Sequence, residues 1–243
     1  MARAIARDAG AAPGRRFLEV GAGLGSLTVA LAEAGAEVLA METDRGLVDA
    51  LGEVVGARPA VRVVHADATE ANWAALLGDG PRRMASNLPY HVAVRVLLDL
   101  LERAPEVDPF VVMVQREVGE RLAAGPGEPA YGAVSLKVAY RSTVRVLRRV
   151  GPSVFWPEPK VDSVVLRLDR HPPPVTVPGP VLFGLVDEGF RQRRKTMAAA
   201  LVRLGHGREQ ARRAMERAGL DPRARAETLG LEEFARLAEA LGA

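Results

Sequence analysis

The chain has 243 residues, 48% of them hydrophobic and 26% charged, which is typical of a folded globular protein with one sizeable core and a smaller appendage. It contains no cysteine, and this excludes disulfides, thiolate metal ligands and a cysteine nucleophile. The formal net charge is only +3, but residues 190–227 hold eleven Arg or Lys residues against four acids, which indicates either a polyanionic partner or a solvated helical surface.

The sequence shows neither a membrane span nor a secretion signal. No stretch approaches the roughly 20 uninterrupted apolar residues that a spanning helix needs, and the first thirty residues are interrupted by charges. We therefore expect a cytoplasmic protein with no membrane partner. The four histidines never fall at the i, i+4 spacing of a helical metal pair, so no metal site is expected.

Short apolar runs of β type alternate with helical periodicity in the first two-thirds of the chain. Strands are expected at residues 16–20, 37–41, 61–65, 83–86, 110–115 and 164–168, and helices at residues 26–34, 46–55, 92–103 and 116–123. This alternation predicts an α/β fold with a doubly wound, mostly parallel sheet.

A proline-rich stretch at residues 171–180 can continue neither a helix nor a strand. Beyond it the periodicity is helical, with helices expected at residues 181–192, 196–204, 208–219 and 231–241. We predict an α/β domain over residues 1–172, a linker over 173–180 and a small all-α domain over 181–243.

The first predicted strand runs directly into a glycine-rich loop, Gly21-Ala22-Gly23-Leu24-Gly25, at the start of a helix. Such glycines let the backbone turn sharply and approach a ligand closely. The spacing is one residue tighter than the dinucleotide form, and Glu19 would repel a pyrophosphate, which disfavours a dehydrogenase. A carboxylate there suits a ligand with a cationic amino group, such as S-adenosylmethionine.

Two further acids follow the next two predicted strands. Glu42 stands where an acid accepts hydrogen bonds from both hydroxyls of a ribose, and Asp67 stands where it can accept from an adenine amine. Three acids at three successive strand ends are a much rarer pattern than any one of them. The residues expected to bind the cofactor are Glu19, Gly21, Ala22, Gly23, Gly25, Glu42, Thr43, Asp67, Ala68 and Asn87.

The fourth predicted strand ends in the tetrapeptide Asn87-Leu88-Pro89-Tyr90. The exocyclic amine of adenine is a poor nucleophile, and two acceptors aimed at its hydrogens favour its reactive, pyramidal form. The Asn87 side-chain carbonyl and the Leu88 backbone carbonyl, which Pro89 frees from a regular ladder, supply two such acceptors. Tyr90 can stack on a flipped base. The structural alternative is a turn that closes the strand, for which Asn-x-Pro is suitable.

With these motifs the sequence resembles the KsgA/Dim-type adenine-N6 dimethyltransferases of small-subunit ribosomal RNA, over nearly the whole chain. The glycine loop and the tetrapeptide carry the resemblance together with Val114-Gln-Arg-Glu-Val-Gly-Glu-Arg121, Ala130-Tyr-Gly132 with Ser135, Phe155-Trp-Pro-Glu-Pro-Lys-Val-Asp-Ser163, and Phe190-Arg-Gln-Arg-Arg-Lys-Thr196. Several independent motifs in the same order make a chance similarity implausible.

The resemblance implies a Rossmann-like class I methyltransferase domain with a seven-stranded sheet and a helical RNA-binding domain. It implies that Glu42 binds the ribose, Asp67 the cofactor adenine, and Asn87 with Leu88 the target amine. Phe155 occupies the position of a second aromatic residue opposite Tyr90, whereas the neighbouring Trp156 is expected in the core. The residues expected to contact RNA phosphates are Arg191, Arg193, Arg194 and Lys195.

The same resemblance implies the reaction and its partners. Two methyl groups per adenosine would pass from S-adenosylmethionine to two adjacent adenosines near the 3′ end of 16S-type RNA, leaving S-adenosylhomocysteine. The partner would be small-subunit RNA within a 30S assembly intermediate, and a monomer is the default expectation.

One departure from the family pattern concerns the N-terminus. Family members begin with a basic arm and a Gly-Gln-Asn-Phe-Leu motif that closes over the cofactor. This sequence starts at Met1-Ala-Arg-Ala-Ile-Ala-Arg-Asp8, within the helix that usually follows, so we expect that the lid segment is missing here. Its absence would put cofactor retention and the exclusion of water from the site in doubt.

Two other functions stay open on the sequence. The first is the sister family that methylates a 23S ribosomal RNA adenosine and confers macrolide resistance, which shares the glycine loop and an Asn-x-Pro-aromatic motif. The second is a non-catalytic RNA-binding assembly factor on the same fold. Tyr131-Gly132, Ser135 and the intact Arg-Arg-Lys run favour the small-subunit enzyme.

Overall fold

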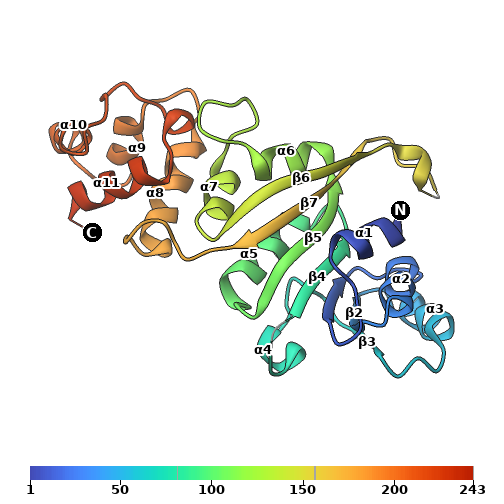
Figure 1. Ribbon diagram of the computed structural model, residues 1–243. Coiled ribbons are helices and arrows are strands. Elements are labelled where there is room, and N and C mark those ends of the chain that lie inside the picture. The colour runs from blue at the N-terminus through green and yellow to red at the C-terminus, as the bar shows by residue number, and fades with distance from the viewer. Residues whose placement is uncertain (81, 156, 243) are drawn as a thin grey trace. The chain divides into compact units, whose positions relative to one another are not determined.

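Seven strands form one sheet in the order β3-β2-β1-β4-β5-β7-β6 in the computed structural model, which describes residues 1–80, 82–155 and 157–242 (Figure 1). The pairs from β3 through to β5 are parallel, and β7 is antiparallel to β5. The strands are β1 (Arg16–Val20), β2 (Glu37–Glu42), β3 (Val61–His65), β4 (Arg82–Asn87), β5 (Val107–Gln115), β6 (Ser142–Val150) and β7 (Ser163–Arg170). The predicted doubly wound, mostly parallel sheet is confirmed.

Helices follow most of the strands, and further helices fill the last third of the chain. They are α1 (Ala2–Asp8), α2 (Ser26–Glu33), α3 (Arg45–Val55), α4 (Trp73–Leu77), α5 (Ala93–Arg103), α6 (Arg116–Ala123), α7 (Ala133–Ala139), α8 (Gly179–Arg191), α9 (Met197–Arg203), α10 (Arg208–Arg217) and α11 (Leu231–Leu241). Short 3₁₀ helices span Pro152–Val154 and Ala226–Thr228. Trp156, predicted as a core residue, lies outside the described residues.

The strand β6 is the element that the sequence patterns do not reveal. Arg145, Arg148 and Arg149 interrupt its apolar run, and most of its side chains are half-buried or exposed. An edge strand needs no continuous buried face, so its sequence lacks the signal that identifies the central strands. The short helices α4 and α7 also escape prediction, since five or seven residues give too little periodicity.

The chain forms two compact units. Unit 1 comprises residues 1–119 and 143–170 and contains nearly all of the sheet, and unit 2 comprises residues 120–142 and 171–243. This division differs from the predicted boundaries, because residues 120–142 belong with the C-terminal helices. Tyr131, Leu136 and Tyr140 are buried in the helical core of unit 2.

Apolar side chains on both faces of the sheet hold unit 1 together. In Figure 1, α1, α2 and α3 lie on one side of the sheet, with α4 and α5 on the other. The first face is packed by residues such as Ile5, Leu31 and Leu51 against Phe17 and Val111. This packing leaves the carboxyl ends of β1 to β4 side by side at one edge, where parallel sheets bind ligands.

The proline-rich segment packs onto unit 2 rather than crossing open solvent. Val177 is buried in the core of this unit, and its carbonyl oxygen accepts a 3.0 Å hydrogen bond from the Tyr140 hydroxyl. Among the described residues, no helix is both long enough and apolar enough to cross a bilayer.

Gly119 in α6 provides a sharp test of the packing between this helix and β7. A Cβ atom on Gly119 would lie 2.2 Å from Cγ2 of Val164. Alanine normally stabilises a helix relative to glycine by about 0.5–1 kcal/mol. Here we expect Gly119→Ala to lower the free energy of unfolding by about 1–3 kcal/mol, because the added methyl overpacks the core. Urea unfolding measures the difference.

Gly184 in α8 is the matched control, because nothing lies within 4 Å of a Cβ atom placed on it. Gly184→Ala should be neutral or stabilising. Gly119→Ala should also cost less in a Val164→Ala background, which lacks the clashing methyl. An equal loss in both backgrounds would contradict the steric explanation.

Candidate active site

The glycine loop after β1 lies against the tetrapeptide after β4. Gly21 has φ +72°, and a Cβ atom on it would lie 2.7 Å from Cδ and Cγ of Pro89. The Gly21 amide donates a 2.8 Å hydrogen bond to the carbonyl oxygen of Met41 in β2. Only glycine satisfies both the left-handed backbone and the close approach. The two loops are therefore in van der Waals contact through this position.

Glu42 at the end of β2 organises the same loop. Its Oε2 accepts a 2.9 Å hydrogen bond from the Gly23 amide, and its Oε1 accepts from the amides of Thr43 and Asp44 at 2.9 and 3.1 Å. The side chain is buried. A carboxylate has about four acceptor positions, so one position, on Oε2, remains for a ligand.

Glu19 is a second buried acid, with 2% of its surface exposed. Burial raises the pKa of its carboxyl from 4.5 to about 8, and the hydrogen bond from Thr28 opposes the rise only in part. That bond is 2.7 Å from Oγ1 of Thr28 to Oε2 of Glu19. A carboxyl with this pKa is mostly protonated at neutral pH.

Asp67 follows β3 and is exposed. Its Oδ1 accepts a 2.7 Å hydrogen bond from the Thr69 amide, and hydrogen bonding to Thr69 lowers the pKa of the carboxyl. The side chain is thus an ionised acceptor at the third strand end, as the sequence predicts for an adenine-binding acid.

Three cavities adjoin one another along this edge of the sheet. The first, about 670 Å³, is bordered by Glu19, the glycine loop, Asn87 and Phe155. The second, about 90 Å³, is bordered by Glu42, Thr43, Asp67 and Ala68, and the third, about 240 Å³, by residues 87–90 and Phe155. Gly21 borders the first and second cavities, and Asn87 borders the first and third. Asn87 therefore stands between a cofactor-sized space and a base-sized space.

Backbone hydrogen bonds hold the tetrapeptide open. The Leu88 amide donates to the Met113 carbonyl oxygen at 3.0 Å, and the Pro89 carbonyl accepts from Val92 and Ala93 at the start of α5. No donor to the Leu88 carbonyl oxygen is found in the described part of the chain. Asn87 is exposed, and Leu88, although its residue is buried, borders the third cavity together with Asn87.

Two buried serines belong to this site although the sequence patterns did not single them out. Ser86 is fully buried, and its Oγ accepts a 2.9 Å hydrogen bond from the Val20 amide at the end of β1. Ser163 at the start of β7 lies 3.0 Å, oxygen to oxygen, from the Tyr90 hydroxyl. The sequence offers one signal for these serines, which is their position in the motifs. Ser86 directly precedes Asn87, and Ser163 is the last residue of the motif that begins at Phe155.

Phe155 lies directly after the 3₁₀ helix Pro152–Val154 and is half-buried. It borders both the first and the third cavities. The structure thus brings together the predicted catalytic residues and the predicted cofactor-binding residues in unit 1.

The four predicted RNA-contact residues lie in unit 2, where α8 ends and the turn to α9 begins. Arg191 is paired with Glu188 at 3.2 Å. Arg193 donates to the Tyr131 carbonyl at 3.1 Å and lies 3.6 Å from the Glu227 carboxylate, so it also braces the unit. Arg194 and Lys195 are exposed in the turn.

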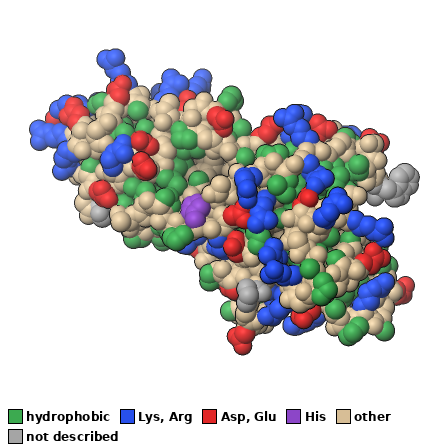
Figure 2. All heavy atoms as spheres, in the orientation of Figure 1, with side chains coloured by type: hydrophobic (Ala, Val, Ile, Leu, Met, Phe, Trp, Pro, Cys, Tyr) green, Lys and Arg blue, Asp and Glu red, His purple; other side chains and the backbone are tan. Residues whose placement is uncertain are grey.

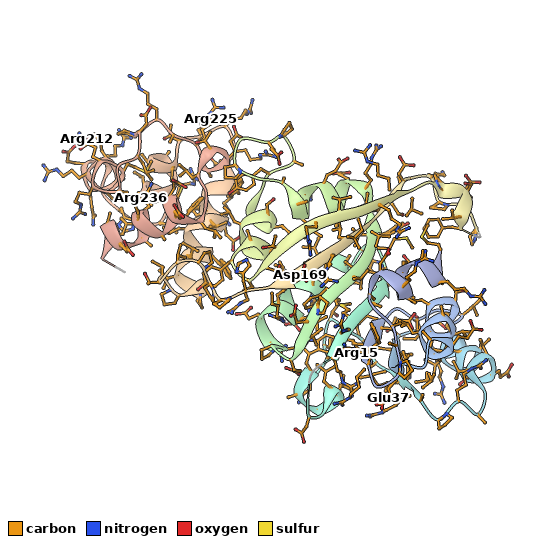
Figure 3. The ribbon with its side chains drawn as sticks, viewed as in Figure 1. Arg15, Glu37, Asp169, Arg212, Arg225 and Arg236 are labelled. Carbon is orange, nitrogen blue, oxygen red and sulfur yellow. The ribbon has the colours of Figure 1, made fainter. Side chains whose placement is uncertain are left out.

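A further basic residue of unit 2, Arg225, lies close to this turn. The Met197 amide donates a 2.8 Å hydrogen bond to the Ala224 carbonyl, which brings the segment before Ala226–Thr228 beside the start of α9. Figure 3 labels Arg225, and Figure 2 shows Lys and Arg side chains along the rim of the helical unit with Asp and Glu side chains among them. Sequence reasoning did not pair these segments, because about thirty residues separate them.

Comparison with known proteins gives consistent results. The model of the family described as "Ribosomal RNA adenine dimethylase" matches residues 1–242. A protein of Streptomyces avermitilis named ribosomal RNA small subunit methyltransferase A is 44% identical over 248 residues, covering 99% of this chain and 83% of its own length. A protein of the same name from Thermobifida fusca is 46% identical over 243 residues, covering 98% and 84%.

Solved structures show the same fold. The 23S rRNA methyltransferase ErmE superposes with a TM-score of 0.72 at 25% identity, covering 100% of this chain and 97% of its own. A dimethyladenosine transferase from Plasmodium falciparum superposes with a TM-score of 0.80 at 22% identity, covering 97% and 93%. The predicted class I methyltransferase fold is confirmed.

The buried carboxyl of Glu19 predicts how stability depends on pH. The folded protein keeps this proton up to about pH 8, whereas an unfolded chain releases it near 4.5. The unfolded state therefore binds fewer protons in this range, and the contribution of Glu19 to stability falls as pH rises from about 4.5 to 8. Glu19→Gln, which cannot ionise, should flatten this decline.

Thermal unfolding of the unliganded protein between pH 5 and 8.5 measures the effect. We expect the melting temperatures of Glu19→Gln and wild type to converge at the acid end and the variant to be more stable at the alkaline end. Glu33→Gln is the control, because that carboxylate is exposed and paired with Arg3. Parallel pH profiles for Glu19→Gln and wild type would refute the assignment.

Proposed function

The chain belongs to the ribosomal RNA adenine dimethylase family, whose members depend on S-adenosylmethionine, and on this premise we propose that it methylates adenine N6 in small-subunit ribosomal RNA. We further propose that two adjacent adenosines near the 3′ end of 16S-type RNA are dimethylated during ribosome assembly. The observation that best supports this proposal is the position of Asn87, which borders both the cofactor-sized cavity and the cavity bordered by Tyr90 and Phe155.

The acids and glycines of unit 1 suit the proposed cofactor. Glu42 retains one acceptor position, on Oε2, for a ribose hydroxyl, and Asp67 in the same cavity is an ionised acceptor for an adenine amine. Glu19 borders the larger cavity, where the positive charge of an ammonium group would lower the pKa of the Glu19 carboxyl, so that its proton is released to solvent and the carboxylate pairs with the cation. S-adenosylmethionine supplies an electrophilic methyl on a sulfonium and leaves as S-adenosylhomocysteine, and the proposal needs no metal.

The residues of the tetrapeptide then prepare the acceptor. The Asn87 side-chain oxygen and the Leu88 carbonyl oxygen accept hydrogen bonds from the N–H groups of the target amine, which localises the nitrogen lone pair. After the N–C bond forms and the S–C bond breaks, the nitrogen releases one proton to solvent. Tyr90 and Phe155 hold the flipped base between their rings, so that the nitrogen faces the cofactor cavity. These groups act by position and do not require a base of matched pKa.

Unit 2 supplies cationic groups for the RNA backbone. Arg194 and Lys195 are exposed, and guanidinium and ammonium groups both bind phosphate. On this proposal the protein acts as a monomer in the cytoplasm on a 30S assembly intermediate. On the same proposal, unit 1 is the catalytic domain and unit 2 is the RNA-binding domain.

A large-subunit substrate is the competing assignment. The fold of the 23S rRNA methyltransferase ErmE is the observation in its favour. Relatives at 44–46% identity over nearly the whole chain carry small-subunit names, whereas ErmE is only 25% identical, which favours the small subunit.

Methyl transfer to purified subunits tests the proposal. Undermethylated 30S and 50S particles are incubated with the protein and labelled S-adenosylmethionine, and the RNA nucleosides are separated. We expect labelled N6,N6-dimethyladenosine from 30S particles alone. Label in 50S particles would support the competing assignment, and no label in either would overturn enzymatic function.

Asn87→Ala removes one of the two acceptors without filling either cavity. We expect kcat to fall by about a hundredfold or more, as when a transition-state hydrogen-bond partner is lost. The affinity for S-adenosylhomocysteine, measured by calorimetry, should change little. A matching loss of cofactor affinity would show that Asn87 serves binding rather than methyl transfer.

Arg194→Ala combined with Lys195→Ala should weaken RNA binding and reduce the slope of log K against log salt by about 1 to 2, because two phosphate contacts are lost. Filter binding of 16S fragments between 50 and 300 mM salt measures the slope. Arg212→Ala is the control, since that guanidinium is paired with Glu209 and Glu216. An unchanged slope in the double variant would place both residues on a merely solvated surface.

A further inference from the structure

We propose that Ser163 is a positioning residue for the target base, because its hydroxyl holds the Tyr90 ring in the orientation on which a flipped adenine stacks. This inference rests on the proposed function. The Tyr90 hydroxyl oxygen lies 3.0 Å from Oγ of Ser163, and Ser163 is fully buried whereas Tyr90 is only half-buried. The half-buried Tyr90 is thus tied to the fully buried Ser163.

Ser163 is a rigid anchor. It is the first residue of β7 and pairs with Gln115 at the end of β5. The preceding residue, Asp162, is bound twice to Arg116: its carbonyl oxygen accepts from the Arg116 amide at 2.9 Å, and its carboxylate accepts from the guanidinium at 3.0 Å. Both the backbone and the neighbouring side chain hold Ser163 beside the carboxyl end of β5.

Ser163 also stands where the connection that carries Phe155 enters the sheet. Tyr90 comes from the loop after β4, Phe155 from the connection between β6 and β7, and both border the third cavity. A hydrogen bond from Tyr90 to Ser163 therefore ties one aromatic wall of this cavity to the base of the segment that bears the other wall. The separation of the two rings depends on this bond.

The expected consequence is confined to the base. Without the Ser163 hydroxyl, the Tyr90 ring keeps its apolar surface but loses the partner that fixes its rotation. Glu19, Glu42 and Asp67 contact neither residue through any hydrogen bond in the described part of the chain, so cofactor affinity should not change. Base stacking and methyl transfer should both weaken.

A double-mutant cycle tests the inference. Ser163→Ala, Tyr90→Phe and the double variant are compared with wild type for methylation of undermethylated 30S particles. Each single variant should lower kcat/KM about five- to tenfold, the effect of losing one hydrogen bond. The double variant should be no worse than either single variant, because both remove the same bond. Affinity for S-adenosylhomocysteine should stay at the wild-type value in all four.

A fluorescence measurement reads the stacking directly. An RNA fragment with 2-aminopurine at the target adenosine should be quenched on binding wild type and less quenched on binding Ser163→Ala. Ser142→Ala is the matched control, since Ser142 is equally buried and its hydroxyl donates to the Val138 carbonyl at 3.1 Å. It should lose stability without changing the quenching or kcat/KM.

The outcomes separate this inference from the function on which it rests. Additive losses in the double variant, or a Ser163→Ala protein as active as wild type, would overturn the positioning role while wild type still methylates 30S particles. A wild-type protein that transfers no methyl group to any particle would overturn the proposed function itself.

Discussion

The geometry of the site depends on the parallel pairing of β1 with β4 at the centre of the sheet. This pairing brings the glycine loop after β1 and the tetrapeptide after β4 to the same edge. Two contacts then keep the loops together. Gly21, which has no side chain, leaves room for the Pro89 ring, and the Ser86 hydroxyl oxygen accepts a hydrogen bond from the Val20 amide. A methyl donor and a methyl acceptor bound in the two loops would meet without a large movement of the backbone.

The two buried acids of this edge solve different electrostatic problems. Glu42 accepts hydrogen bonds from three backbone amides, which satisfy most of its acceptor positions although little of it is exposed. Glu19 has a single hydroxyl partner, and its burial keeps it protonated near neutral pH. One carboxylate is thus a permanent part of the loop, while the other becomes charged only when a cation compensates it. A site of this kind favours ligands that carry a positive amino group.

The sequence predicts most of the fold and the chemistry of the site, because both depend on local patterns. Most of the central strands are apolar runs, and the three acids and the tetrapeptide each lie at or just beyond the carboxyl end of one strand. The patterns fail where a residue acts through a distant partner. Ser86 and Val20 are sixty-six residues apart, Tyr90 and Ser163 seventy-three, and nothing local marks their hydrogen bonds. Arg193 looks like its neighbour Arg194, yet its contact with Tyr131 exists only after unit 2 has folded.

The composition of the third cavity has a consequence for how the proposed reaction can be controlled. Its described lining consists of Asn87, Leu88, Tyr90, Phe155 and three prolines, with no carboxylate, imidazole or amine among them. On the proposed function, a site built this way would activate its substrate through neutral acceptors and aromatic surfaces, whose effect depends on distance and orientation rather than on protonation. Rigidity then takes the place that a tuned pKa holds in acid–base catalysis. The prolines, the buried serines and the glycine with no room for a side chain all restrict the same few atoms, and any relaxation among them should appear as a slower methyl transfer at every pH.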